Sequence, residues 1–207
     1  MSVWVTSDTH FGHDRDFVYG PRGFESISEH DKKIIENWNS VIAPNDVVYH
    51  LGDVMLNDNT YGMKCLGQLN GNIRIIPGNH DTPRRLALYG ILPNVEVLRL
   101  AEIIKFDKHN FYFSHHPTIT SNLDFDKPLK ARLINICGHC HTKDKFEDMD
   151  KGVIYHVEMD AHDNFPIKLE TALEEIKKYI KATTPEGEIL FEPTENAKAL
   201  LEFVDNK

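Results

Sequence analysis

Short runs of apolar, β-branched and aromatic residues alternate along this chain with segments in which apolar residues recur every three to four positions. The opening stretch "SVWVTSD" predicts a strand, and a helix is predicted where the helical spacing follows, at Ile34, Ile35, Trp38, Val41 and Ile42. Pro44-Asn45-Asp46 breaks that helix before the apolar run "VVYHL" at 47–51. Strand, helix, strand in this order is typical of an α/β domain.

Predicted strands and helices continue to alternate until about residue 95, where several predicted strands follow one another without a helix between them. Residues 63–69 and "PRRLALYGIL" predict helices on either side of the strand "NIRIIP". From Val95 to His116, the runs "VEVLRL", "EIIKF" and "NFYFSHH" are separated by short polar turns, which predicts a mostly antiparallel group of strands. "LINICGHCH" and "GVIYHVEMDAH" predict two more strands, and a helix is predicted at Ala172, Leu173, Ile176, Tyr179 and Ile180.

The C-terminal residues differ from the rest. Residues 183–193 are punctuated by Pro and Gly, and Ala197, Leu200, Leu201 and Val204 follow at the i, i+3, i+4, i+7 spacing of an amphipathic helix. We therefore expect one domain over residues 1–182 and a C-terminal extension over 183–207 with a helix at 194–204.

Composition narrows the class of protein. With 207 residues and 41% hydrophobic content, the chain can bury a substantial core. Its 23 basic and 32 acidic residues give a net charge of −9, which argues against a surface that grips a long nucleic-acid duplex. Three cysteines without an apolar leader favour the cytoplasm, and no apolar run reaches the ~20 residues that a membrane span needs. We expect a soluble protein.

Five predicted strands run directly into polar clusters that contain metal-capable side chains. They are "VWVTSDTH", "VVYHLGDV", "IRIIPGNHD", "NFYFSHH" and "NICGHCH". Ligands of open α/β sheets bind beyond the carboxyl ends of the strands, so these clusters are expected to converge. In an extended strand end, residues two apart project to one side, which pairs Asp8 with His10 and His139 with His141.

The two cysteines of "CGHCH" have a simpler interpretation than a zinc site. A structural cysteine-zinc site needs a second ligand pair, and the only other cysteine is Cys65. We interpret Cys137 and Cys140 as buried packing residues.

The five clusters, in this order, resemble the motifs of calcineurin-like metallophosphoesterases. They are Asp8-Thr9-His10, Gly52-Asp53, Gly78-Asn79-His80-Asp81, Ser114-His115-His116-Pro117 and Gly138-His139-Cys140-His141. The resemblance covers residues 3 to about 175 and leaves the extension outside. It implies an α/β fold: a two-sheet αββα sandwich of the metallo-dependent phosphatase type, mixed parallel and antiparallel, with a dinuclear metal site at the strand ends.

The resemblance also implies a set of metal ligands. One ion would be held by Asp8, His10, Asp53 and His141, and the other by Asp53, Asn79, His115 and His139, so that Asp53 bridges the two. All seven ligands offer N or O atoms, which suits Mn, Fe, Co, Ni or Zn, and Mn is favoured. Two such ions activate a bridging hydroxide and bind phosphoryl oxygens.

Other motif residues receive roles beside the metals. His80 is implied to be the general acid that protonates the leaving oxygen, with Asp81 orienting its ring. His115 is preferred to His116 as the ligand. His13, His116 and Arg84 are candidates for contacts with a metal ligand or the substrate. Arginines 15, 22 and 85 are further candidates for a phosphate contact, whereas histidines 30, 50, 109 and 156 are read as ordinary hydrogen-bonded side chains.

These features predict a dinuclear metal-dependent phosphohydrolase acting on a small or nucleotide-like phosphate ester, as a phosphomonoesterase, a phosphodiesterase or both. Two alternatives stay open: a nuclease that acts on nucleic-acid ends, and a catalytically silent metal-binding scaffold. The loops at 14–30 and 117–131 carry no diagnostic motif for the substrate, and His162 in "DAHDNFPI" stands where relatives are expected to have a larger aromatic residue. The oligomeric state stays open.

Overall fold

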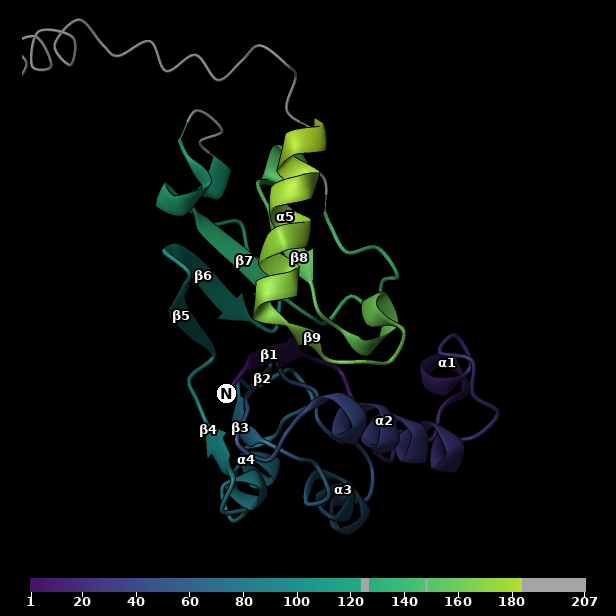
Figure 1. The fold of residues 1–207 in the computed structure, drawn as a ribbon. Coiled ribbons are helices and arrows are strands. Elements are labelled where there is room, and N and C mark those ends of the chain that lie inside the picture. The colour runs from purple at the N-terminus through teal and green to yellow at the C-terminus, as the bar shows by residue number, and fades with distance from the viewer. Residues whose placement is uncertain (124–126, 148, 184–207) are drawn as a thin grey trace, which may run out of the picture.

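Two mixed β-sheets form the centre of the computed structural model, which describes residues 1–123, 127–147 and 149–183 (Figure 1). The predicted helix at 194–204 lies outside the described residues. The first sheet has the order β4-β3-β2-β1-β9. Its strands are β1 (Val3–Thr6), β2 (Val47–His50), β3 (Asn72–Ile75), β4 (Val95–Val97) and β9 (Ile167–Lys168). The first four are mutually parallel, and β9 runs antiparallel to β1.

The second sheet has the order β5-β6-β7-β8. Its strands are β5 (Ala101–Phe106), β6 (His109–Ser114), β7 (Leu133–Cys137) and β8 (Ile154–His156). The antiparallel group predicted for residues 95–116 is wrong in extent, because of its three strands only β5 and β6 pair antiparallel. The β6–β7 and β7–β8 pairs are parallel, and β4 belongs to the first sheet, parallel to β3. A long connection precedes β4, β7 and β8, as a strand parallel to its predecessor requires.

Helices cover the first sheet on the side that faces away from the second sheet (Figure 1). They are α2 (Ile27–Val41), α3 (Asn59–Leu66) and α4 (Pro83–Tyr89), and a short α1 (Asp16–Tyr19) precedes them. Side chains of Ser26, Asp58 and Thr82 cap the three longer helices by accepting backbone N–H bonds. Short 3₁₀ turns lie at Ser121–Leu123, Leu129–Ala131, Met149–Lys151 and Met159–His162.

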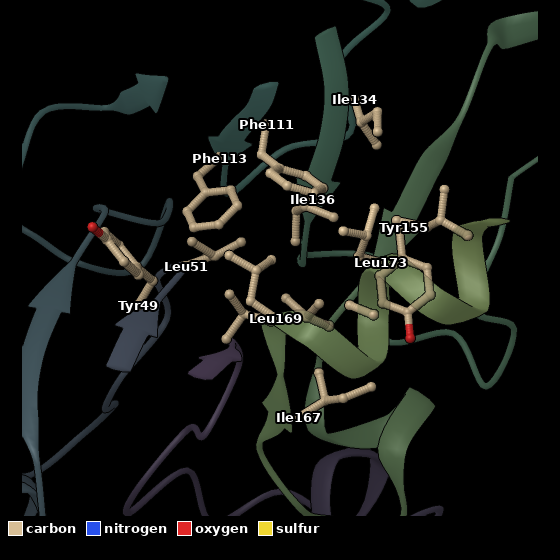
Figure 2. Close-up of a cluster of buried hydrophobic side chains, with 14 of the residues drawn as sticks. Tyr49, Leu51, Phe111, Phe113, Ile134, Ile136, Tyr155, Ile167, Leu169 and Leu173 are labelled. Atoms are coloured by element: carbon tan, nitrogen blue, oxygen red, sulfur yellow. The ribbon is translucent and has the colours of Figure 1, made fainter. Parts of the chain in front are cut away.

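Two apolar clusters hold these layers together. In the first, Trp4, Val48 and Ile73 pack under α2 residues such as Ile34 and Trp38. The second fills the space between the sheets, where Phe111, Phe113, Ile134 and Ile136 face Leu51 and the residues Leu169 and Leu173 of α5 (Leu169–Thr183), as Figure 2 shows. Burial of such apolar surface is the dominant favourable term in folding.

The fold class predicted from the sequence is confirmed in its two mixed sheets and flanking helices. Strands β1, β2 and β3 run in one direction, and β6 and β7 run parallel to each other, so the loops after each set of strands gather at one edge of its sheet. None of the helices within the described ranges combines the length and the apolar character that a membrane-spanning segment needs.

Candidate metal centre

Three side chains from two distant loops form a first cluster of potential ligands. Nε2 of His10, after β1, lies 3.1 Å from Nε2 of His141, after β7. Oδ1 of Asp8 lies 3.6 Å from the His10 nitrogen and 3.7 Å from the His141 nitrogen. Three atoms with lone pairs therefore face a common point.

A second cluster lies beside the first. Oδ1 of Asn79, after β3, is 2.9 Å from Nε2 of His115 and 2.9 Å from Nδ1 of His139. The two ring nitrogens are 3.2 Å apart. His115 follows β6 and is 2% exposed, whereas His116 is exposed. A ring nitrogen of His116 also lies within 4.8 Å of nitrogens of His115 and His139, so both histidines of the pair border this cluster.

Asp53 lies between the two clusters. Its Oδ2 is 3.7 Å from Nε2 of His10 and 3.5 Å from Nε2 of His115. The structure thus brings together all seven candidate ligands, in two groups with one carboxylate between them; that they bind metal stays a prediction.

The backbone at these positions is unusual. Five of the seven residues have a positive φ: Asp8 (58°), His10 (50°), Asp53 (57°), His139 (77°) and His141 (50°). The expectation of extended strand ends is therefore wrong, and His139 and His141 do not project to one side but reach different clusters. Non-glycine residues with a left-handed backbone are uncommon, and they gather at functional sites.

In two histidines, His115 and His141, the hydrogen bond at Nδ1 decides whether Nε2 carries a proton or a free lone pair. Nδ1 of His115 lies 2.8 Å from the Leu51 carbonyl, and Nδ1 of His141 lies 3.0 Å from Oδ2 of Asp160. Each Nδ1 is thus assigned the proton, which leaves Nε2 with a bare lone pair. These lone pairs face other acceptors, and Oδ1 of Asp8 is buried without a hydrogen-bond partner among the described residues. A cation with an affinity for N and O donors fits both clusters.

Burial sets the protonation of the same residues. It raises the pKa of Asp53 to about 6 and lowers the pKa of His10 to about 4, because a buried group resists carrying charge. Burial also acts to raise the pKa of Asp8, but the neighbouring rings of His10, His115 and His141 outweigh it and hold that pKa far below its usual range. A positive ion between these carboxylates would stabilise their ionised forms.

A cavity of about 300 Å³ opens onto the two clusters. Its polar lining consists of candidate ligands and of His13 and His80, and its apolar lining comes from α1. The residues are His10, His13, Phe17, Val18, Asp53, Asn79, His80, His139 and His141. His80 is 42% exposed through its side chain, with Nε2 3.9 Å from Oδ2 of Asp53. Its backbone N–H donates to Oδ1 of Asp53 at 2.9 Å.

Asp81 does not orient the His80 ring, contrary to the sequence-based expectation. Its Oδ2 accepts from the N–H groups of Asp53 (2.7 Å) and Gly78 (2.9 Å). Its Oδ1 accepts from the Val54 N–H (3.2 Å) and the Tyr89 hydroxyl (2.7 Å). A carboxylate offers about four acceptor sites, and all four are used here to fix the loops after β2 and β3.

Of the residues predicted to contact the substrate, the two histidines lie beside the candidate ligands and the arginine does not. His13 lines the cavity, with its ring 5.2 Å from the His10 ring, and the His116 ring is 4.3 Å from the His139 ring. Burial lowers the pKa of both His13 and His116. Arg84 does not line this cavity, contrary to the sequence-based expectation. It lines a separate hollow between α3 and α4. Arg85 donates instead to the His80 carbonyl at 2.6 Å.

Two further differences concern residues around the centre. Cys137 is buried as expected, but Cys140 is exposed, because the loop leaves the sheet at Gly138. Asp160 was not singled out by the sequence, although it contacts His141 and a buried Arg22. No spacing signal links these residues, since Arg22 and Asp160 are 138 positions apart.

The chain is also similar to known proteins. The family model of the calcineurin-like phosphoesterase superfamily domain matches residues 1–157. An uncharacterized protein of Methanocaldococcus jannaschii is 35% identical over 126 residues, which cover 60% of this chain and 64% of that protein, less than two thirds of its length. The gene 66 protein of Mycobacterium phage D29 is 30% identical over 80% of this chain and 92% of its own length.

A solved structure supports the fold. The crystal structure of a protein of unknown function from Aquifex aeolicus is similar over 86% of this chain and 98% of its own, with a TM-score of 0.59 and 21% identity. At this identity the likeness concerns the fold alone.

Proposed function

Since this chain belongs to the calcineurin-like phosphoesterase superfamily, we propose that it is a dinuclear metal-dependent phosphohydrolase that cleaves phosphate esters. Family membership indicates a phosphoesterase, which is a hydrolase of ester bonds. The observation that supports the metal dependence is the position of Asp53, whose Oδ2 lies 3.7 Å from Nε2 of His10 in one cluster and 3.5 Å from Nε2 of His115 in the other.

In this proposal each cluster holds one divalent ion, and Asp53 contacts both. The first ion would be held by Asp8, His10, Asp53 and His141, and the second by Asp53, Asn79, His115 and His139. When bound, such a pair of ions lowers the pKa of a water molecule and neutralises the oxygens of a phosphoryl group. Mn²⁺ is the first ion to test, because all seven donors are N or O atoms.

His80 is proposed to donate a proton to the leaving oxygen. Its ring lines the cavity, while its backbone is held by the bonds to Asp53 and Arg85. The ring is therefore presented to the substrate from a fixed loop. A positioned proton donor contributes typically about 10²–10⁴-fold to the rate.

The cavity favours a small or nucleotide-like ester as the substrate. A volume of about 300 Å³ fits the small end of the range for ligand pockets. The net charge of −9 adds no attraction for a long polyanion, so a substrate phosphate would be drawn by the ions and not by the protein surface.

The experiment is a substrate screen of metal-free protein before and after reconstitution with Mn²⁺. Phosphomonoesters, linear phosphodiesters and cyclic nucleotides are compared, and metal-dependent hydrolysis of at least one small ester class is expected. Protein that binds two ions but hydrolyses none would be a silent scaffold. Activity confined to the ends of nucleic acids would make it a nuclease. Either result would contradict the proposed substrate class.

A further inference from the structure

The segment "MDAHDNFPI" at 159–167 contains a buried carboxylate that the proposed reaction does not use. Asp160 lies in the 3₁₀ turn Met159–His162, and its side chain is 5% exposed. Its Oδ2 is 3.0 Å from Nδ1 of His141, on the side of that ring away from the metal cluster. The same carboxylate accepts two bonds from Arg22, at 3.0 Å from Nε and 2.7 Å from Nη2.

Arg22 connects this carboxylate to a second ligand. Its side chain is 1% exposed, and Nη2 donates to the backbone carbonyl of Asp8 at 2.8 Å. One guanidinium therefore contacts the carboxylate behind His141 and the loop that carries Asp8. Nη2 also lies 3.4 Å from Nδ1 of His141, but the Asp160 oxygen is nearer, so the ring is best described as donating to Asp160.

The network extends to the loop after His10. Nη1 of Arg22 lies 2.9 Å from Nε2 of His30, whose Nδ1 is 2.8 Å from Oδ1 of Asp31. Oδ2 of Asp31 accepts the N–H of Gly12 at 2.9 Å. The buried charges thus reach every chain segment that supplies the first cluster: the loop with Asp8 and His10, and the loop with His141.

Stability alone is a weak reason for this arrangement. Burying a guanidinium and a carboxylate costs several kcal/mol per ion, and well-packed apolar residues often do as well. Behind the second cluster, the His115 ring is held by the uncharged Leu51 carbonyl. The Arg22–Asp160 ion pair, in contrast, lies behind the first cluster.

We propose that Arg22 and Asp160 are positioning residues for the Asp8–His10–His141 metal site. Asp160 holds the proton on Nδ1 of His141, so that Nε2 faces the cluster as a bare donor, and Arg22 fixes both Asp160 and the Asp8 loop. The inference rests on the proposed function, since it concerns the affinity of one of its two ions.

The test is a titration of metal-free protein with Mn²⁺ in competition with a chelator. Wild type is expected to bind two ions. Asp160→Ala is expected to weaken one of them by about 10–100-fold, the usual effect of losing a partner behind a metal-bound histidine, and to leave the other unchanged. Asp160→Asn keeps an oxygen toward Nδ1 and should fall between wild type and Asp160→Ala. Asp163→Asn, an exposed substitution at the end of the same turn, is the control and should bind as wild type does.

A double substitution separates positioning from folding. If the pair acts as one device, Arg22→Met with Asp160→Ala should weaken the affected ion no more than the stronger single variant does. Unchanged affinities in a folded Asp160→Ala or Asp160→Asn protein would overturn the inference. Equal weakening of both ions, together with a lower melting temperature of the metal-free protein, would also overturn it, because that is the signature of a structural role. Wild type that binds fewer than two ions would overturn the proposed function itself, and this inference with it.

Discussion

Nδ1 of His115 and Nδ1 of His141 each face a fixed acceptor, and this decides the chemistry that the opposite side of each ring offers. With the proton held at Nδ1, the Nε2 lone pair points toward a carboxylate or an amide oxygen. In water such an arrangement would be relieved by solvent, but His115 and Asp53 are each 2% exposed. These lone pairs and the oxygens beside them therefore suit a bound cation.

His80 provides a prediction at the same scale. His80→Ala should slow hydrolysis of alkyl phosphates at least ~10-fold more than hydrolysis of nitrophenyl esters, because a nitrophenolate departs without a proton. Steady-state kinetics on both substrate types, with metal content measured in parallel, check this. His109→Ala, at the first residue of β6, is the matched control. Equal losses on both substrates at full metal content would remove the general-acid role.

The sequence predicted the seven candidate ligands because each stands in a short motif directly after an apolar run. It did not predict the function of Asp81, since the four groups that its carboxylate accepts are known only from the fold. The Arg22–Asp160 ion pair could not be predicted from the sequence for the same reason. A motif reveals residues that are close in the chain, whereas these contacts join loops from opposite ends of the domain.

At the scale of elements, the loops after β2 and β3 act as one unit because Asp81 joins them. Asp81→Asn replaces an acceptor by an NH₂ group that faces N–H donors, so the free energy of unfolding should fall by on the order of 2–4 kcal/mol. Tyr89→Phe removes only one of the four bonds and should cost about 1 kcal/mol. Urea unfolding of the metal-free proteins measures both. Equal costs for the two variants would contradict the role assigned to Asp81.

Helix α1 supplies the apolar wall of the cavity. Phe17 is 72% exposed, and its ring lies 5.6 Å from the His13 ring at 89°. Because aromatic rings gain about 0.5–1.5 kcal/mol from such contacts, Phe17→Ala should raise KM for aryl esters roughly 2–10-fold and leave KM for alkyl esters nearly unchanged. Phe165→Ala, outside the cavity lining, is the control. Identical KM changes for aryl and alkyl esters would show that α1 does not contact the leaving group.

Helices and strands were predicted well, because the spacing of apolar residues identifies them. The pairing of strands within a sheet was predicted less well. The helix around Ile34 and Trp38 and the strands that contain Val5, Val48 and Ile73 follow from spacing. Spacing does not tell which neighbour a strand pairs with, so β4 was grouped with the strands that follow it. Register with Ile73 and Ile75 places it in the first sheet. The left-handed backbone at the ligands was equally hidden, since Asp and His adopt many conformations.

At the scale of the whole molecule, the extension after Thr183 is predicted to contribute to stability or assembly. Its apolar positions Ala197, Leu200, Leu201 and Val204 would form an exposed stripe if the predicted helix had no partner. Truncation after Thr183 should lower the melting temperature or change the oligomeric state, while metal content stays the same. Calorimetry and light scattering on both lengths test this, and no change in either property would refute it.

The most direct measurement of the central claim is the number of Mn²⁺ ions bound by metal-free wild-type protein and by Asp53→Asn, from calorimetric titration and elemental analysis. The geometry predicts about two ions for wild type, because two clusters share Asp53. Asp53→Asn should lose both the tight binding and the hydrolysis, since one charge is removed where two cations meet. A single tight site in wild type, or wild-type metal content and rate in Asp53→Asn, would contradict the dinuclear account.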